Sequence, residues 1–214
     1  MMLRSFIYLI FFTVGINTKS FSQIGRLSIG LERSPQFTWF SAKNADLIKT
    51  NNKWGDNYGL QIQYDFPGHL GISTNFIVAN QKTDFQYAEQ KFRLANRFFK
   101  IPFMLSYTAK PTGQASLIWR IGPQLSLLNR AEVSNNTSDI SKASYDRRLL
   151  AGMTAYGGYR LYIVDFVSLN FGLRFDHDFS TLSYEDASAI HLPSGRNRTL
   201  SFVFGVNILN FLIN

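Results

Sequence analysis

The sequence predicts an all-β fold, an eight-stranded antiparallel up-and-down transmembrane β-barrel, and three observations carry this prediction. Apolar and polar residues alternate with a period of two along most of the chain, which is the pattern of strands with two unlike faces. The connections between these segments are alternately long and short. Only 17% of the residues are charged and 15% are aromatic, whereas a water-soluble domain carries about 25% charged residues.

The beginning of the chain has the pattern of a signal peptide. A short basic start and an apolar run over residues 5–16 are followed by Ser20 and Ser22, small residues at the two positions that a signal peptidase reads. This run is shorter than the roughly 20 apolar residues that a membrane-spanning helix needs. We therefore expect residues 1–22 to be a signal peptide, cleaved after about Ser22, and residues 23–214 to form one outer-membrane β-barrel domain.

Each predicted strand alternates large apolar residues with small or polar ones, and seven are clear. The glycine-rich segment 147–159 is the eighth strand, although either of its faces can be the apolar one. The predicted strands, in chain order, are 24–33, 54–65, 70–80, 96–108, 116–128, 147–159, 166–176 and 199–209.

The connections between these strands indicate which end of the barrel lies outside the cell. Short connections carry turn signals such as Pro67-Gly68, and outer-membrane barrels keep short turns on the periplasmic side. An even number of strands then places both chain ends on that side. The four long connections, expected outside the cell, are 34–53, 81–95, 129–146 and 177–198.

The two faces of the strands are assigned to lipid and to the barrel interior. Large apolar residues on one face suit a hydrocarbon surrounding, whereas the other face is mostly polar and includes charges. An eight-stranded interior is just wide enough for side chains to fill, which favours an ion-paired interior over a pore lining. A soluble ligand-binding barrel would show the same alternation with the apolar face inward, and this alternative stays open. The residues expected to face lipid are Leu60, Ile62, Phe103, Leu105, Trp119, Leu169, Phe171, Phe202 and Phe204. The expected interior polar network is Arg26, Glu32, Asp65, Lys100, Arg120, Arg174 and Asp176.

One motif resembles a known family. The strand Phe99-Lys100-Ile101-Pro102-Phe103-Met104-Leu105-Ser106-Tyr107, followed after a short turn by Ile121-Gly122-Pro123, is similar to the PorT-like outer-membrane β-barrel family of the Bacteroidota. In that family an "IPLLLKY"-like strand precedes a strand that ends in a Gly-Pro step. The resemblance implies an outer-membrane barrel and a role with the type IX secretion system.

The sequence offers little that points to catalysis. There is no cysteine and no phosphate-binding GxxxxGK[ST] loop. His177 lies between two aspartates, but Ser180, three residues further on, falls on the other face of a continued strand. Asp176, His177 and Asp178 alternate faces, so they do not converge on a metal. We expect no catalytic residue, no cofactor and no metal, and a non-enzymatic structural or interaction role in the cell envelope.

The expected partners are outer-membrane lipid and lipopolysaccharide, together with other envelope proteins. The net charge is +8, but the basic residues are scattered, so nucleic acid is not an expected partner. Arg147, Arg148, Arg196 and Arg198 are candidates for contact with lipopolysaccharide headgroups. Phe37, Trp39 and Phe40, in the first long connection, are candidate loop contacts. The alternative functions are a small porin-like channel and a lipid-modifying barrel enzyme.

Overall fold

The computed structural model describes residues 25–42, 49–87, 90–109, 114–135, 140–142, 149–164, 166–182 and 194–213. In these residues every regular element is a β-strand. No helix in this part of the chain is long and apolar enough to cross a membrane. The expected signal peptide, residues 1–22, lies outside the described residues.

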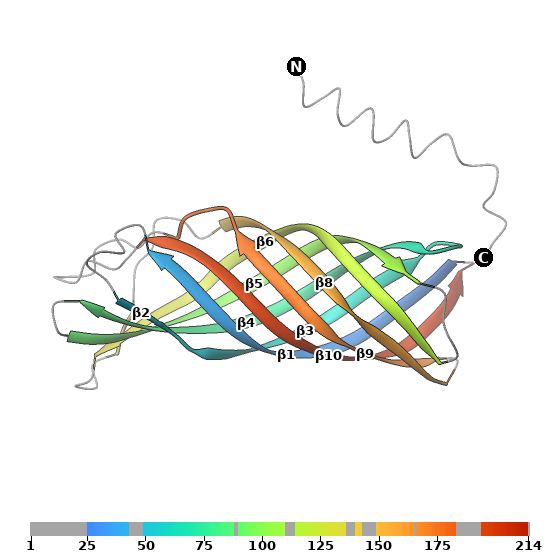
Figure 1. The fold of residues 1–214 in the computed structure, drawn as a ribbon, viewed down its shortest axis with the longest axis horizontal. Coiled ribbons are helices and arrows are strands. Elements are labelled where there is room, and N and C mark those ends of the chain that lie inside the picture. Colours follow the sequence, from blue (N-terminus) through green and yellow to red (C-terminus); the bar gives the residue numbers. More distant parts are fainter. Residues whose placement is uncertain are drawn as a thin grey trace, which may run out of the picture.

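Eight antiparallel strands close into a barrel, which confirms the predicted fold class. Neighbouring strands follow one another in the chain, and β1 pairs with β10 to close the wall (Figure 1). A closed wall leaves no barrel strand with an unpaired edge. The barrel strands are β1 (Gly25–Ala42), β3 (Trp54–Asp65), β4 (Leu70–Tyr87), β5 (Gln90–Thr108), β6 (Ala115–Asn135), β8 (Leu149–Val164), β9 (Val167–Asp178) and β10 (Gly195–Ile213).

The short connections lie at the end of the barrel that carries the chain ends. Gly25 pairs with Ile213, so the first and last strands meet there (Figure 1). Between β3 and β4, the Phe66 amide donates a hydrogen bond to the Leu70 carbonyl oxygen (2.9 Å), and Gly68 has φ = 111°. That left-handed conformation is easy only for glycine, which is why the turn contains the Pro-Gly pair.

Strand β8 settles the face that the sequence left open. Leu150, Thr154 and Tyr156 point into the barrel and are buried, whereas Leu149 and Tyr159 point outward and are exposed. Tyr156 fits inside because Gly158 and Gly172 of the wall beside it have no side chains. A Cβ atom would lie 2.5 Å from the Tyr156 hydroxyl oxygen at Gly158 and 2.9 Å from it at Gly172.

The far end of the barrel differs from the prediction of long loops. Strands β4, β5 and β6 have 18, 19 and 21 residues, whereas a tilted strand crosses the hydrocarbon layer in roughly 9–11. The predicted loop 81–95 is therefore wrong for most of its length, because β4 and β5 continue until only residues 88–89 separate them. The period of two continues there, but the apolar side chains change from the outward to the inward face.

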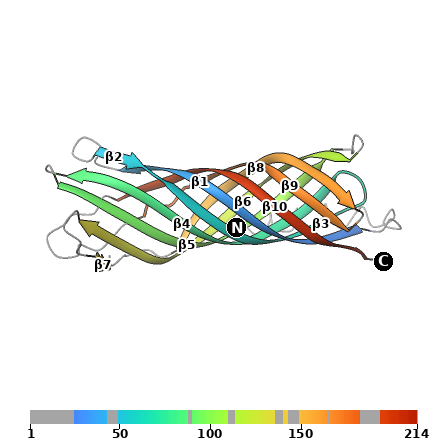
Figure 2. The same ribbon diagram turned by 90° about the horizontal axis from the view of Figure 1, so that it is seen from below.

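These extensions form a second region, which we call the outer sheet. It consists of residues 81–87 of β4, 90–97 of β5 and 129–135 of β6, flanked by two short strands. β2 (Lys49–Asn52) pairs with β4, and β7 (Ile140–Lys142) pairs with β6. Figure 2 shows these two strands at the end of the molecule away from the C-terminus.

Candidate functional site

The barrel interior holds a network of buried ion pairs, and Arg174 on β9 is at its centre. Its Nη1 atom donates to Glu32 Oε1 on β1 at 2.5 Å, and its Nη2 atom donates to Ser34 Oγ at 3.0 Å. The second oxygen of Glu32 accepts a hydrogen bond from Asn75 Nδ2 at 2.7 Å. The Arg174 and Glu32 side chains are each only 2% exposed, so each charge depends on the other for compensation.

A second buried pair lies beside the first. Lys100 Nζ on β5 donates to Asp176 Oδ2 at 3.1 Å, and Thr154 Oγ1 donates to Asp176 Oδ1 at 2.7 Å. Arg174 Nε lies 3.7 Å from Asp176 Oδ1, which joins the two pairs. The network thereby ties strands on opposite sides of the barrel to each other.

A third group is organised around Gln63 of β3. Its Oε1 atom accepts hydrogen bonds from Arg120 Nη2 and Arg160 Nη2, both at 2.8 Å. Arg160 Nη1 also pairs with Asp65 Oδ2 at 2.9 Å, and the Arg120 guanidinium lies 4.7 Å from the centroid of the Tyr156 ring. The two guanidiniums thus share the neutral amide oxygen of Gln63. The Asp65 carboxylate compensates Arg160, and the Tyr156 ring faces Arg120.

Six of the seven residues predicted for the interior polar network lie in the interior. The structure brings Glu32, Asp65, Lys100, Arg120, Arg174 and Asp176 into the interior. The placement of Arg26 is corrected: its side chain is exposed, because it lies near the end of β1 where the barrel opens to water.

Among the interior residues that the sequence prediction missed are two charged residues and the shared acceptor Gln63. Arg160 lies just beyond the expected end of strand 147–159, and Asp178 lies just beyond the expected end of 166–176. Gln63 carries no charge, so nothing distinguished it from other polar alternations. Continuing the period of two from Thr154 to Arg160, and from Asp176 to Asp178, is the signal that finds the first two.

Towards the outer sheet the interior becomes apolar. Ile77, Phe98, Leu128 and Leu150 belong to one buried cluster that reaches into the outer sheet, where Phe85 and Phe92 stack with ring centroids 5.2 Å apart. A continuous water-filled pore would expose its lining, but Lys100, Gln36 and Gln63 are each 1% exposed or less. The interior is therefore packed with side chains across both its polar and its apolar parts.

The outer wall presents an apolar belt. All nine residues expected to face lipid lie on the outward face of their strands, and Leu105, at 67% exposed, is the most exposed of them. Apolar exposure on this scale is a liability in water and is the normal surface of a barrel in lipid.

The three candidate loop contacts do not lie in a loop. Phe37, Trp39 and Phe40 belong to β1, which continues to Ala42 because its alternation persists past the belt. Phe40 points inward and is 5% exposed. Phe37 packs edge-on against Trp39, at 4.9 Å between ring centroids, and against Trp54 of β3 at 5.6 Å.

His177 and Ser180 do not form a nucleophile and base pair. The Ser180 hydroxyl oxygen accepts a hydrogen bond from the Ala151 amide at 3.0 Å, and the His177 ring packs against Phe179 at 5.3 Å between centroids. In the described part of the chain, no three His, Asp or Glu side chains cluster as metal ligands would.

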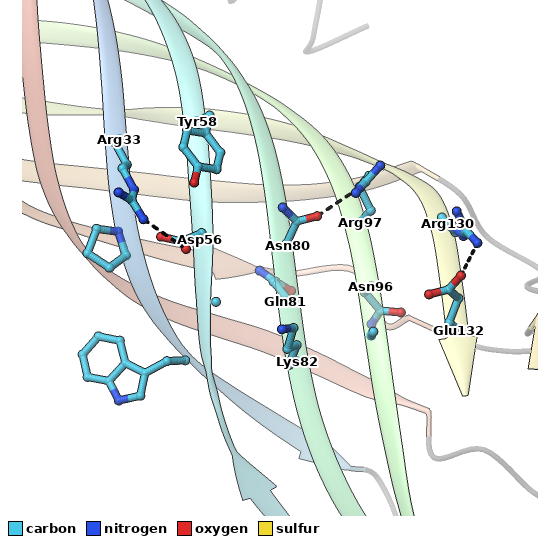
Figure 3. Close-up of a pocket in the computed structure, with 14 residues that line it drawn as sticks. Arg33, Asp56, Tyr58, Asn80, Gln81, Lys82, Asn96, Arg97, Arg130 and Glu132 are labelled. Atoms are coloured by element: carbon cyan, nitrogen blue, oxygen red, sulfur yellow. Dashed lines mark hydrogen bonds and ion pairs between the residues drawn. The ribbon is translucent and has the colours of Figure 1, made fainter. Parts of the chain in front are cut away.

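A groove of about 630 Å³ crosses the outward face where the wall passes into the outer sheet. Figure 3 shows its side chains, which come in turn from β1, β3, β4, β5 and β6. Arg33 pairs with Asp56 at 3.5 Å, Arg97 Nε donates to Asn80 Oδ1 at 3.0 Å, and Arg130 pairs with Glu132. Polar and basic groups thus line a hollow directly beyond the apolar belt.

The four arginines predicted to contact lipopolysaccharide lie elsewhere. Arg196 and Arg198 are exposed on β10, whereas Arg147 and Arg148 lie outside the described residues.

A closed barrel with an apolar belt outside and an ion-paired interior defines a membrane-spanning β-barrel protein of the outer-membrane class. Residues 10–183 match the family described as "Outer membrane protein beta-barrel domain", and the chain belongs to this family. It is an outer-membrane β-barrel protein.

Solved structures share this fold at low sequence identity. OprG of Pseudomonas aeruginosa is 10% identical, with a TM-score of 0.61 over 89% of this chain and 97% of that one. Neisserial surface protein A is 13% identical, with a TM-score of 0.54 over 86% and 96%. A major outer membrane protein of Thermus thermophilus is 12% identical, with a TM-score of 0.52 over 85% and 99%. A comparison with curated protein sequences finds no match.

Proposed function

We propose that this outer-membrane barrel is a non-enzymatic structural and interaction protein of the cell envelope, acting through its outer sheet and outer wall. The observation that carries this proposal is the packed interior, because a barrel filled by paired side chains offers no solute path. The outer sheet projects beyond the belt and gives the protein a hydrogen-bonded surface for contacts outside the membrane.

Conductance separates this proposal from the channel alternative. The purified barrel, inserted in a planar bilayer, should give no discrete current steps at 100 mV in 1 M KCl, whereas a sixteen-stranded porin in the same bilayer supplies the positive control. Regular steps from the wild-type barrel would reject the closed interior and favour a small channel.

We also propose outer-membrane lipid and lipopolysaccharide as partners. The exposed positions of Arg196 and Arg198 on β10 support contact with anionic headgroups, and Arg147 and Arg148 are included from the sequence. Replacing all four by Gln should weaken association with lipopolysaccharide in a co-sedimentation assay, and unchanged association would remove these four residues from the proposal.

A role as a PorT-like accessory of type IX secretion is the finer form of the proposal. Its support is the resemblance of the segment Phe99–Tyr107 and of Ile121-Gly122-Pro123 to that family. Mild-detergent extraction should then recover the barrel in a complex with larger envelope proteins. Migration only at the size of the free barrel would argue against this role.

A further inference from the structure

The groove on the outer wall places two arginines directly opposite each other. Arg97 of β5 and Arg130 of β6 are register partners, and both side chains are exposed on the outward face. Lys82 of β4 lies two pairs further along, opposite Ala95 and on the same outward face. Like charges at directly opposed positions of an antiparallel pair destabilise it, so an anion between them would relieve the repulsion.

The carboxylates nearby neutralise only part of this cluster. Asp56 is engaged by Arg33, and Glu132 pairs with Arg130 from the same strand. Arg97 bonds to the neutral Asn80 amide, and among the described residues neither it nor Lys82 has an ion-pair partner. The groove keeps an excess of positive charge on two neighbouring strands.

The row of residues next to the arginines is apolar. Tyr58, Val78, Phe99 and Leu127 are successive register partners across four strands, and they form the edge of the belt. A ligand whose anionic group sits at Arg97 and Arg130 can therefore lay hydrocarbon chains along this row. That geometry suits an amphiphile better than a water-soluble anion.

The strand pairing is interrupted at the groove. Asp56 of β3 pairs with Asn80 of β4, and Asn52 of β2 pairs with Thr83 of β4. Between these two pairs, three residues on one side face two on the other, and the ladder along β4 is interrupted. From inside, Gln36 Nε2 donates to the Asn80 carbonyl oxygen at 3.0 Å. The groove lies at this interruption, and the hydrogen bond from Gln36 satisfies the Asn80 carbonyl oxygen from the interior.

We propose that this groove binds the phosphate headgroup of an anionic glycolipid of the outer leaflet, with the acyl chains on the belt below. Arg97 and Arg130 would hold the phosphate and Lys82 would flank it, since guanidinium groups bind phosphate through charge-assisted hydrogen bonds. The inference rests on the proposed partnership with outer-leaflet lipid, and it names a site distinct from the arginines of β10.

The test measures glycolipid adducts on the full-length barrel by native mass spectrometry in a neutral detergent. The probes are a diphosphorylated lipid A, the same glycolipid without phosphates, and inorganic phosphate. Arg97→Gln/Arg130→Gln removes the cluster, Arg97→Lys/Arg130→Lys keeps its charge, and Lys91→Gln/Arg93→Gln removes two charges from the same face of β5 outside the groove. Heat-modified gel mobility verifies that each variant is folded.

We expect the Gln variant to bind the diphosphorylated glycolipid at least about tenfold more weakly than wild type, with the control near wild type and the Lys variant between them. Equal losses in the control and the groove variant would overturn the site while leaving the lipid partnership standing. Wild-type binding that ignores the phosphates would overturn the phosphate site alone, whereas no adduct with either glycolipid would overturn both the site and the lipid partnership. Inorganic phosphate that occupies the groove as tightly as the glycolipid would overturn the assignment to a lipid.

Discussion

The membrane-spanning wall and the outer sheet are built from the same strands but have opposite faces. In the wall of β5, Phe103 points outward and Lys100 points inward; in the outer sheet of the same strand, Arg93 points outward and Phe92 points inward. The change occurs at one row, where Val78, Phe99 and Leu127 are register partners. The period of two shows only that a strand has two unlike faces. Where lipid surrounds the strand the outward face is apolar, and where water surrounds it the inward face is apolar.

The largest expected effect comes from breaking the polar interior of the wall. Arg174→Leu leaves Glu32 and Asp176 buried without their shared cation, which places the cost at the upper end of about 3–5 kcal/mol. Equilibrium unfolding of the barrel in lipid vesicles with guanidinium measures it. The double variant Arg174→Leu/Glu32→Leu should recover much of the loss, and a single variant as stable as wild type would contradict the ion-paired interior.

The matching change in the outer sheet removes an apolar side chain. Phe92 is 4% exposed, so Phe92→Ala should cost about 3 kcal/mol locally and loosen the sheet without opening the barrel. Hydrogen exchange should increase in residues 81–97, while the shift in gel mobility on heating is kept. Lys91→Ala, on the opposite face of the same strand, is the control. Loss of the mobility shift in Phe92→Ala would show that the two regions fold as one unit.

Outward substitutions test the position of the boundary. Phe103→Arg places a charge on the lipid face and should destabilise the barrel by about 2 kcal/mol or more, whereas Ala95→Arg, outward on the same strand in the outer sheet, should change stability by less than about 0.5 kcal/mol. Unfolding titrations in vesicles compare the two variants. Equal costs would mean that the lipid boundary does not lie between them.

The smallest effect concerns Asp84, which lies beyond the belt in the outer sheet. Partial burial alone would raise the pKa of Asp84, but hydrogen bonds and charges from Arg93 and Lys53 outweigh it and lower the pKa. The pair energy, below about 1 kcal/mol because solvent screens it, is present above the unfolded pKa and is lost as the pH falls through the folded pKa. Asp84→Asn should therefore loosen the outer sheet at pH 7, and its hydrogen exchange should converge with wild type in acid. A difference independent of pH would exclude this cause.

The sequence predicted the wall well because its signal is strong there. Residues such as Leu105 and Phe171 repeat every second position, and only a strand in lipid needs large apolar groups on its outside. The predicted strands stopped at 80 and resumed at 96 because charged residues such as Lys82 and Arg93 take the outward positions there. Polar outward residues are typical of loops, and the apolar residues that continue the alternation now point inward.

The polar interior was only partly predictable, since its charges had to be placed on strands with known ends. Arg26 and Arg160 show the difficulty: both fit the alternation and lie towards the same end of the barrel, but the first is exposed and the second is buried. Which polar residues meet depends on the shear of the closed sheet, and no single strand contains that information. The groove likewise depends on Arg97 and Arg130 falling in register.

The pairing of β1 with β10 also sets the order of events during assembly. These strands are the first and the last of the eight in chain order, so their pairs form only after Gly195–Ile213 has been made and delivered. Until then the other seven strands are an open ribbon with two edges whose backbone groups lipid cannot satisfy. Pairing of the last strand with the first removes both edges at once, so a stable place in the hydrocarbon layer requires the whole chain through β10.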